Sequence, residues 1–105
     1  MIMLDHLAHL YEKFGACTSD EDRETVAKEI CLECSMAIWK TCDIAVPQIP
    51  VFDADSVLQY YDIARQASKV GKSRQDESER AIITFYASAL KEKSLWLSKR
   101  YGEVC

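Results

Sequence analysis

Apolar side chains recur every three to four residues along four separate segments of this chain. That spacing is typical of one face of an α-helix. No segment longer than a few residues alternates with the period of two that a half-buried strand requires, so we expect no sheet. The expected helices run over about residues 2–14, from near Ser19 to about Cys42, from Asp53 or Asp55 to Gly71, and over about residues 74–101.

Residues at the ends of these segments resemble known helix signals. Gly15 is expected as a left-handed cap just past the first helix, and Gly71 is expected to end the third helix. The segment Thr18–Glu21 has the form of a capping box, and Ser73–Asp76 has the same form before the fourth helix. Four helices with short connections favour an antiparallel bundle or a close variant, so we expect an all-α fold, a compact four-helix bundle or a variant, with residues 1–105 in a single domain.

Charge is unevenly distributed along the chain. Residues 19–42 contain six acids and three bases, and residues 72–105 contain five acids and seven bases. If the second and fourth helices pack antiparallel, the acidic start of one lies near the basic end of the other. We therefore expect ion pairs between the acids Asp20, Glu21, Asp22 and Glu24 and the bases Lys99 and Arg100.

The second helix has two apolar stripes, which predicts burial on more than one side or contact with another chain. The first stripe consists of Val26, Ala27, Ile30, Cys31, Cys34, Ala37, Ile38 and Cys42, and the second of Leu32, Met36 and Trp39. The inner stripe of the third helix is expected to be Val57, Leu58, Tyr61, Ala64, Ala67 and Val70. The fourth helix should bury Ile82, Ile83, Phe85, Tyr86, Ala89, Leu90, Trp96, Leu97 and Tyr101.

The connection between the second and third helices, residues 43–55, is unusual because it is both long and apolar. Pro47 and Pro50 exclude a helix and a central strand there. The segment must therefore either cover the core or bind a partner. Its apolar residues, together with two from the second helix, are the candidate protein-binding residues: Ile44, Val46, Ile49, Val51, Phe52, Met36 and Trp39.

The net charge of −4 and the pI near 5.1 argue against nucleic acid as a partner, because nucleic-acid-binding domains are usually strongly basic. No apolar run approaches the roughly 20 residues that cross a bilayer, so no membrane role is expected. The start of the chain has no basic region before its apolar stretch and does not resemble a secretory signal. We therefore expect a cytoplasmic protein, in the host cytoplasm if the chain is viral.

Five cysteines without a secretory signal argue against a disulfide framework. The pair Cys31 and Cys34 has a metal-site spacing, and Cys42 could add a third ligand for zinc or an iron–sulfur cluster. Because all three lie on the apolar stripe of a helix, we expect packed free thiols instead. No metal or other cofactor is expected.

No set of residues typical of an active site is readable, so a non-enzymatic protein is expected. The leading hypothesis is a small module that binds another protein stoichiometrically, as inhibitors, immunity or antitoxin proteins and phage counter-defence proteins do. One alternative is a helical, metal-dependent nucleotide hydrolase that uses Glu24, Glu29 and Glu33 of the second helix with Asp62 of the third. Another is a structural subunit that assembles with copies of itself.

Overall fold

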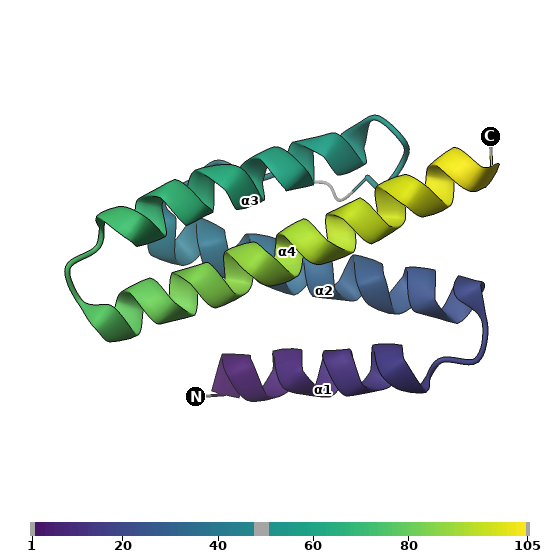
Figure 1. Cartoon of the computed structure of the whole chain (residues 1–105), viewed down its shortest axis with the longest axis horizontal. Helices are drawn as coiled ribbons and strands as arrows, with labels where there is room; N and C mark the ends of the chain where they lie inside the picture. Colours follow the sequence, from purple (N-terminus) through teal and green to yellow (C-terminus); the bar gives the residue numbers. More distant parts are fainter. Residues whose placement is uncertain (1, 48–50, 105) are drawn as a thin grey trace.

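The computed structural model describes residues 2–47 and 51–104 of the chain. Within these ranges the residues form four α-helices and no strand, which confirms the all-α prediction. The helices are α1 (Ile2–Ala16), α2 (Asp20–Cys42), α3 (Ser56–Ser73) and α4 (Glu77–Val104) (Figure 1). They pack into a compact bundle that measures 42 × 27 × 20 Å.

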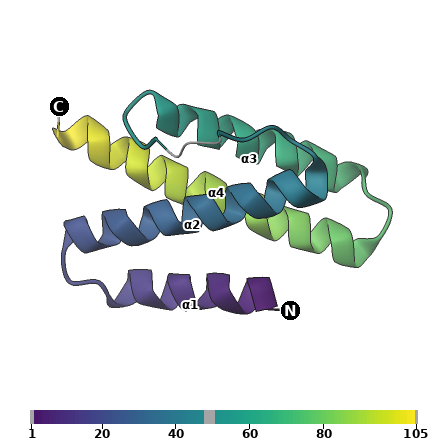
Figure 2. The same cartoon turned by 180° about the vertical axis from the view of Figure 1, so that it is seen from behind.

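The four helices form two layers. The α3–α4 pair lies in front of α2 in Figure 1, and α2 comes to the front when the molecule is turned round in Figure 2. α1 runs antiparallel to α2 below it, and α2 runs antiparallel to α4. α3 runs in the same direction as α2, so the antiparallel arrangement favoured from sequence is wrong for this pair, and the bundle is a variant of the up-and-down form.

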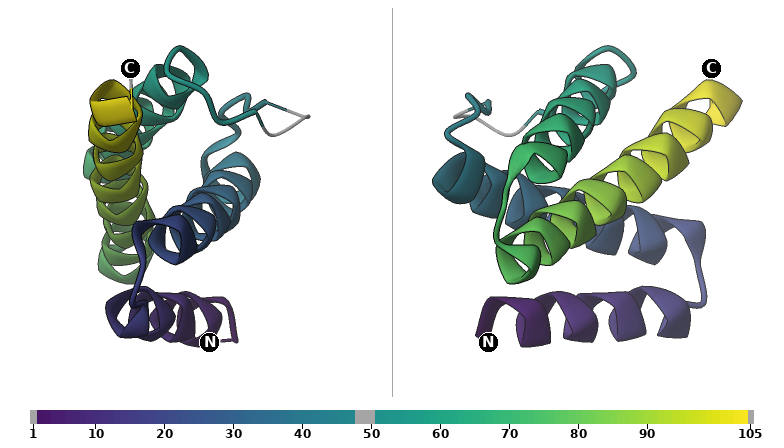
Figure 3. Two further views of the ribbon diagram at one scale, coloured as in Figure 1. Left: turned by 90° about the vertical axis from the view of Figure 1, so that its right-hand side faces the viewer. Right: turned by 60° about the vertical axis from the view of Figure 1, so that its left-hand side comes forward.

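Because α2 and α3 point the same way, the chain between them must return along the length of the bundle. We call residues 43–55 the crossover. It leaves α2 at Asp43, yet the ring centroid of Phe52 lies 6.0 Å from the Nζ of Lys28, in the first half of α2. The Phe52 ring stacks on Tyr60 of α3, with ring centroids 4.9 Å apart and planes 10° from parallel. Phe52 of the crossover thus lies beside α2 and α3, and α2 lies between the described part of the crossover and α1 (Figure 3).

Acidic and hydroxyl side chains cap the starts of the helices. The Oγ of Ser19 accepts a hydrogen bond from the backbone N–H of Asp22, so the α2 cap lies one residue later than the sequence suggested. The Oδ1 of Asp53 accepts from the N–H of Ser56 at 2.7 Å, and Asp76 caps α4 in the same way. Each cap satisfies backbone donors that have no partner inside the helix.

Gly15, expected as a left-handed cap, and Gly71, expected to end the third helix, both lie inside helices instead. Among the described residues no glycine has a positive φ, and α1 and α3 continue past Gly15 and Gly71 to Ala16 and Ser73. Gly71 is buried, and a Cβ there would lie 3.0 Å from the Cγ2 of Ile83. Because Gly71 has no side chain, α3 can pack closely on α4 at this position. Gly71 thus serves helix packing and does not end the helix.

The first apolar stripe of α2 is fully buried, as predicted. The predicted faces of α3 and α4 are wrong at Leu58, which is 59% exposed, and at Phe85, which is 46% exposed. Both helices lie in an outer layer and have one covered side, so apolar residues at the edge of a stripe remain in water. The side that α3 buries consists of Val57, Tyr60, Ile63, Ala64, Ala67 and Gly71.

Candidate functional site

The second apolar stripe of α2 lies on the surface. Met36 is 50% exposed and Trp39 is 49% exposed, and both lie on the side of α2 opposite its buried stripe. Leu32, one helical turn before Met36, is partly buried. We call this surface, with Glu29 and Glu33, the outward face of α2. It belongs to the layer that is nearest the viewer in Figure 2.

The outward face carries two acids, Glu29 and Glu33, and one base, Lys40, which lies one turn after Met36. Glu33 lies 3.5 Å from the Nε2 of His6, a contact that is an ion pair only when the imidazole is protonated. Glu29 forms no ion pair with any residue that the structure describes. Two half-exposed apolar side chains therefore share a helix face with two carboxylates and one ammonium group.

The crossover contributes to the core at both of its ends. Ile44 is buried, and Val46 and Phe52 pack partly buried against the core. Val51 is 48% exposed. Ile49, the remaining candidate from this segment, lies outside the described residues. Packing on the core thus accounts for the apolar side chains of Ile44, Val46 and Phe52. It does not account for Val51.

The cysteines of α2 are buried thiols. Cys31, Cys34 and Cys42 lie in the core, and Cys17 is partly buried with its thiol donating to the carbonyl of Lys13. Burial raises the pKa of Cys31 from its ordinary value of 9.0 to about 12, and it raises the pKa of Cys34 further. In the described part of the chain, no three His, Cys, Asp or Glu side chains are grouped as metal ligands.

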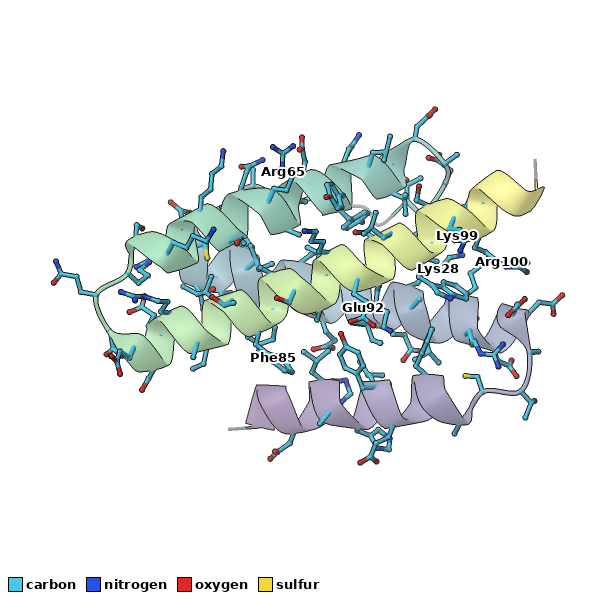
Figure 4. The ribbon with its side chains drawn as sticks, viewed as in Figure 1. Lys28, Arg65, Phe85, Glu92, Lys99 and Arg100 are labelled. Carbon is cyan, nitrogen blue, oxygen red and sulfur yellow. The ribbon has the colours of Figure 1, made fainter. Side chains whose placement is uncertain are left out.

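The acids of the hydrolase alternative do not converge. Glu24 pairs with Lys28 at 3.3 Å and with Arg100 at 3.6 Å, whereas Asp62 pairs with Arg65 on α3. The pair between Glu24 and Arg100 confirms the predicted approach of the α2 start to the α4 end, where Figure 4 shows Lys28 and Arg100 close together. These carboxylates act in separate contacts and offer no shared metal position.

Lys93 is a buried cation that the sequence pattern did not reveal. Its side chain is 4% exposed, with Nζ 3.9 Å from the Phe14 ring centroid and 4.8 Å from that of Tyr11. The ammonium also lies 3.0 Å from the Oε1 of Glu92. Helical spacing does predict burial of Lys93, because it lies three residues after Leu90 and therefore on the same buried side of α4. Two aromatic faces and one carboxylate stabilise this charge away from water.

A second apolar surface lies between α1 and α4. A shallow groove of about 430 Å³ is lined by Ala8, Tyr11, Phe85, Ser88, Ala89 and Glu92. Figure 4 shows Phe85 and Glu92 on the edge of α4 that faces α1. Phe85 is the large exposed side chain of this groove, which is separate from the outward face of α2.

Comparison of the chain with protein-family models, with curated proteins and with solved structures finds no match. Among the described helices, none combines the length and the apolar character that a membrane span requires.

Proposed function

We propose that this protein binds another protein stoichiometrically through the outward face of α2, without catalysing a reaction. The observation that carries the proposal is the exposure of Trp39 next to Met36 on a helix whose other side is already filled by the core. Exposed tryptophan is uncommon, and tryptophans dominate the binding energy of many interfaces. A long, regular helix presents the pair with little loss of conformational entropy on binding.

The charges around the pair indicate the chemistry of the partner. Glu29 and Glu33 lie on the same face, and the whole chain carries a net charge of −4. A complementary partner would offer an apolar cleft for Trp39 with lysine or arginine side chains at its rim. Inhibitors, immunity or antitoxin proteins and phage counter-defence proteins act by stoichiometric binding to a partner protein. In this proposal the protein belongs to that functional class and acts in the cytoplasm.

The crossover has a supporting role in this proposal. Ile44, Val46 and Phe52 contact the core, and Phe52 connects α3 to the first half of α2 through Tyr60 and Lys28. The crossover thereby fixes the position of α2 relative to α3. Val51, which is half-exposed, offers apolar surface on the crossover itself.

Self-assembly through the same face is the second candidate, and the same two exposed side chains favour it. A two-fold symmetric contact would bring the outward face of one copy against that of another. In such a contact a residue of one copy meets a different residue of the other, so Lys40 of each copy can lie near Glu29 or Glu33 of its partner, and the local charges do not oppose pairing. The net charge of −4 on each copy opposes self-association and therefore favours a basic partner over a second copy.

The decisive experiment replaces Trp39 with Asp and uses Leu95→Asp as the matched control. Leu95 is 50% exposed on α4, so the control adds the same charge at an equally exposed apolar position. Native mass spectrometry of the wild type gives its oligomeric state, and a partner isolated from the source cells is then titrated by calorimetry. We expect Trp39→Asp to weaken binding at least about 30-fold and Leu95→Asp to leave it unchanged.

Both variants should keep the wild-type melting temperature within a few degrees, because neither side chain lies in the core. Partner binding should also weaken as salt is added, since the rim contact is electrostatic. Full binding by Trp39→Asp would contradict the proposal. A wild-type dimer that Trp39→Asp alone converts to a monomer would replace it with self-assembly.

A further inference from the structure

The α3–α4 pair carries a groove that differs in charge from the rest of this acidic protein. It encloses about 250 Å³ and is lined by Ala64, Arg65, Ser68, Lys69, Lys72, Ala87, Ser88 and Lys91. Four of these residues are cations, two bear hydroxyl groups, and none bears a carboxylate. Figure 4 locates Arg65 on α3, on the layer opposite the one that holds the outward face of α2.

The positive charge of this groove is poorly neutralised by the protein itself. Lys69, Lys72 and Lys91 form no ion pair with any residue in the ranges 2–47 and 51–104. Arg65 has one partner, Asp62, at 3.7 Å, and both side chains are more than half exposed. Like charges three and four residues apart destabilise a helix, so the α3 cations oppose folding until an anion lies between them.

The geometry brings the cations toward one another across the two helices. Arg65, Lys69 and Lys72 follow one side of α3 over about 10 Å. The Nζ of Lys91 on α4 lies 5.9 Å from the ring centroid of Tyr61, so this side chain extends toward α3. Ala64 and Ala87 are both buried at the floor, and their small side chains let the helices approach closely.

We propose that this groove binds a compact polyphosphate anion, free or carried by a nucleotide. Several cations at fixed spacing with adjacent hydroxyls are the groups that recognise phosphate oxygens. The volume is below the roughly 300 Å³ of the smallest typical small-molecule sites, so the groove holds the phosphates and leaves any attached group outside. The net charge of −4 disfavours general attraction of anions to the protein, so binding depends on this local cluster.

The test titrates tripolyphosphate into the whole protein by calorimetry at constant ionic strength. The double variant Lys69→Gln with Lys72→Gln removes two groove cations, and Lys13→Gln with Lys99→Gln removes two exposed cations elsewhere. We expect saturable binding of one anion per chain by the wild type and by the control. The groove variant should bind at least about tenfold more weakly, as expected when charged hydrogen bonds are lost.

A parallel titration with ATP identifies the source of the phosphates. Equal affinity for ATP and tripolyphosphate assigns the free phosphates as the ligand, and tighter binding of ATP assigns a nucleotide. Non-saturating heats, or equal weakening in the two double variants with unchanged melting temperatures, would overturn the proposal. Preference for a single-stranded oligonucleotide over tripolyphosphate, increasing with its length, would overturn it in favour of a nucleic-acid backbone.

Discussion

The two connections that flank α3 differ in length, in composition and in the relative direction of the helices that they join. The crossover joins helices that run in the same direction, whereas residues 74–76 join α3 to its antiparallel neighbour α4. The crossover carries apolar side chains that pack on the helices, and the short turn is entirely polar. Arg74 holds the turn by donating from Nη2 to the carbonyl of Thr41 at 3.1 Å and by pairing with Glu79 at 2.9 Å.

The difference shows that helix direction determines what a connection must contain. An antiparallel neighbour begins where the previous helix ends, so a few polar residues suffice. A parallel neighbour begins at the far end, and α3, with 18 residues, is about 27 Å long. Thirteen extended residues reach at most about 43 Å, which is enough to return beside the bundle. A connection that passes along the helices can bury apolar groups, and this crossover does so.

The largest expected effect comes from removing the aromatic ring that fixes the end of the crossover. Phe52→Ala should lower the free energy of unfolding by about 2–3 kcal/mol, somewhat less than for a fully buried phenylalanine because the ring is only partly buried. Urea denaturation measures the change, and Val51→Ala is the control because Val51 is half-exposed. Equal losses for the two variants would show that the stacking on Tyr60 contributes nothing to stability.

Sequence periodicity predicted the fold class and the buried stripe of α2 because that helix contacts neighbours along its whole length. It failed at Leu58 and Phe85, since the covered sides of α3 and α4 depend on how these helices are placed in the bundle. The sequence-based prediction also favoured an antiparallel bundle, whereas α3 runs parallel to α2. The length and apolar content of residues 43–55 are consistent with a connection between parallel helices. Periodicity within a helix does not report the direction of that helix relative to another.

Removing the contacts of Arg74 in the short turn should lower the free energy of unfolding less than removing the Phe52 ring from the crossover. Arg74→Ala removes the bond to the Thr41 carbonyl and the ion pair with Glu79, and should cost about 1 kcal/mol of unfolding free energy because the side chain is one-third exposed. Gln75→Ala, at an exposed position in the same turn, is the control and should be neutral. A loss as large as that of Phe52→Ala would mean that the two connections contribute equally.

The candidate surfaces were predictable to different extents. Met36 and Trp39 were identified from sequence because a second stripe on one helix is a local pattern. The basic groove was not, since its cations come from α3 and α4 and meet only through packing. Lys93 was missed for a related reason. A lysine on a buried stripe contradicts the usual pattern, and the rings of Tyr11 and Phe14 that accommodate it lie about 80 residues earlier.

The smallest expected effect concerns the cap at the end of the crossover and appears as a pH dependence. Hydrogen bonds from the backbone N–H and the hydroxyl of Ser56 lower the pKa of Asp53 below its ordinary value of 3.8. A carboxyl group with a lowered pKa in the folded state stabilises the fold fully above its unfolded pKa. That contribution is lost as the pH falls from about 3.8 through the lower folded value.

Asp53→Asn removes the titrating group and keeps a side-chain acceptor for the α3 cap. Between pH 5 and pH 2, about the range in which a carboxyl group titrates, the melting temperature of the variant should therefore fall less steeply than that of the wild type. Asp55→Asn is the matched control, because Asp55 is exposed in the same segment and makes no capping hydrogen bond with its side chain. If both variants follow the wild-type curve, the Asp53 carboxylate does not contribute to the acid sensitivity of the crossover. If Asp53→Asn alone is flatter, the crossover is fixed at both ends, by the packing of Ile44 and Phe52 and by a charged cap at the start of α3.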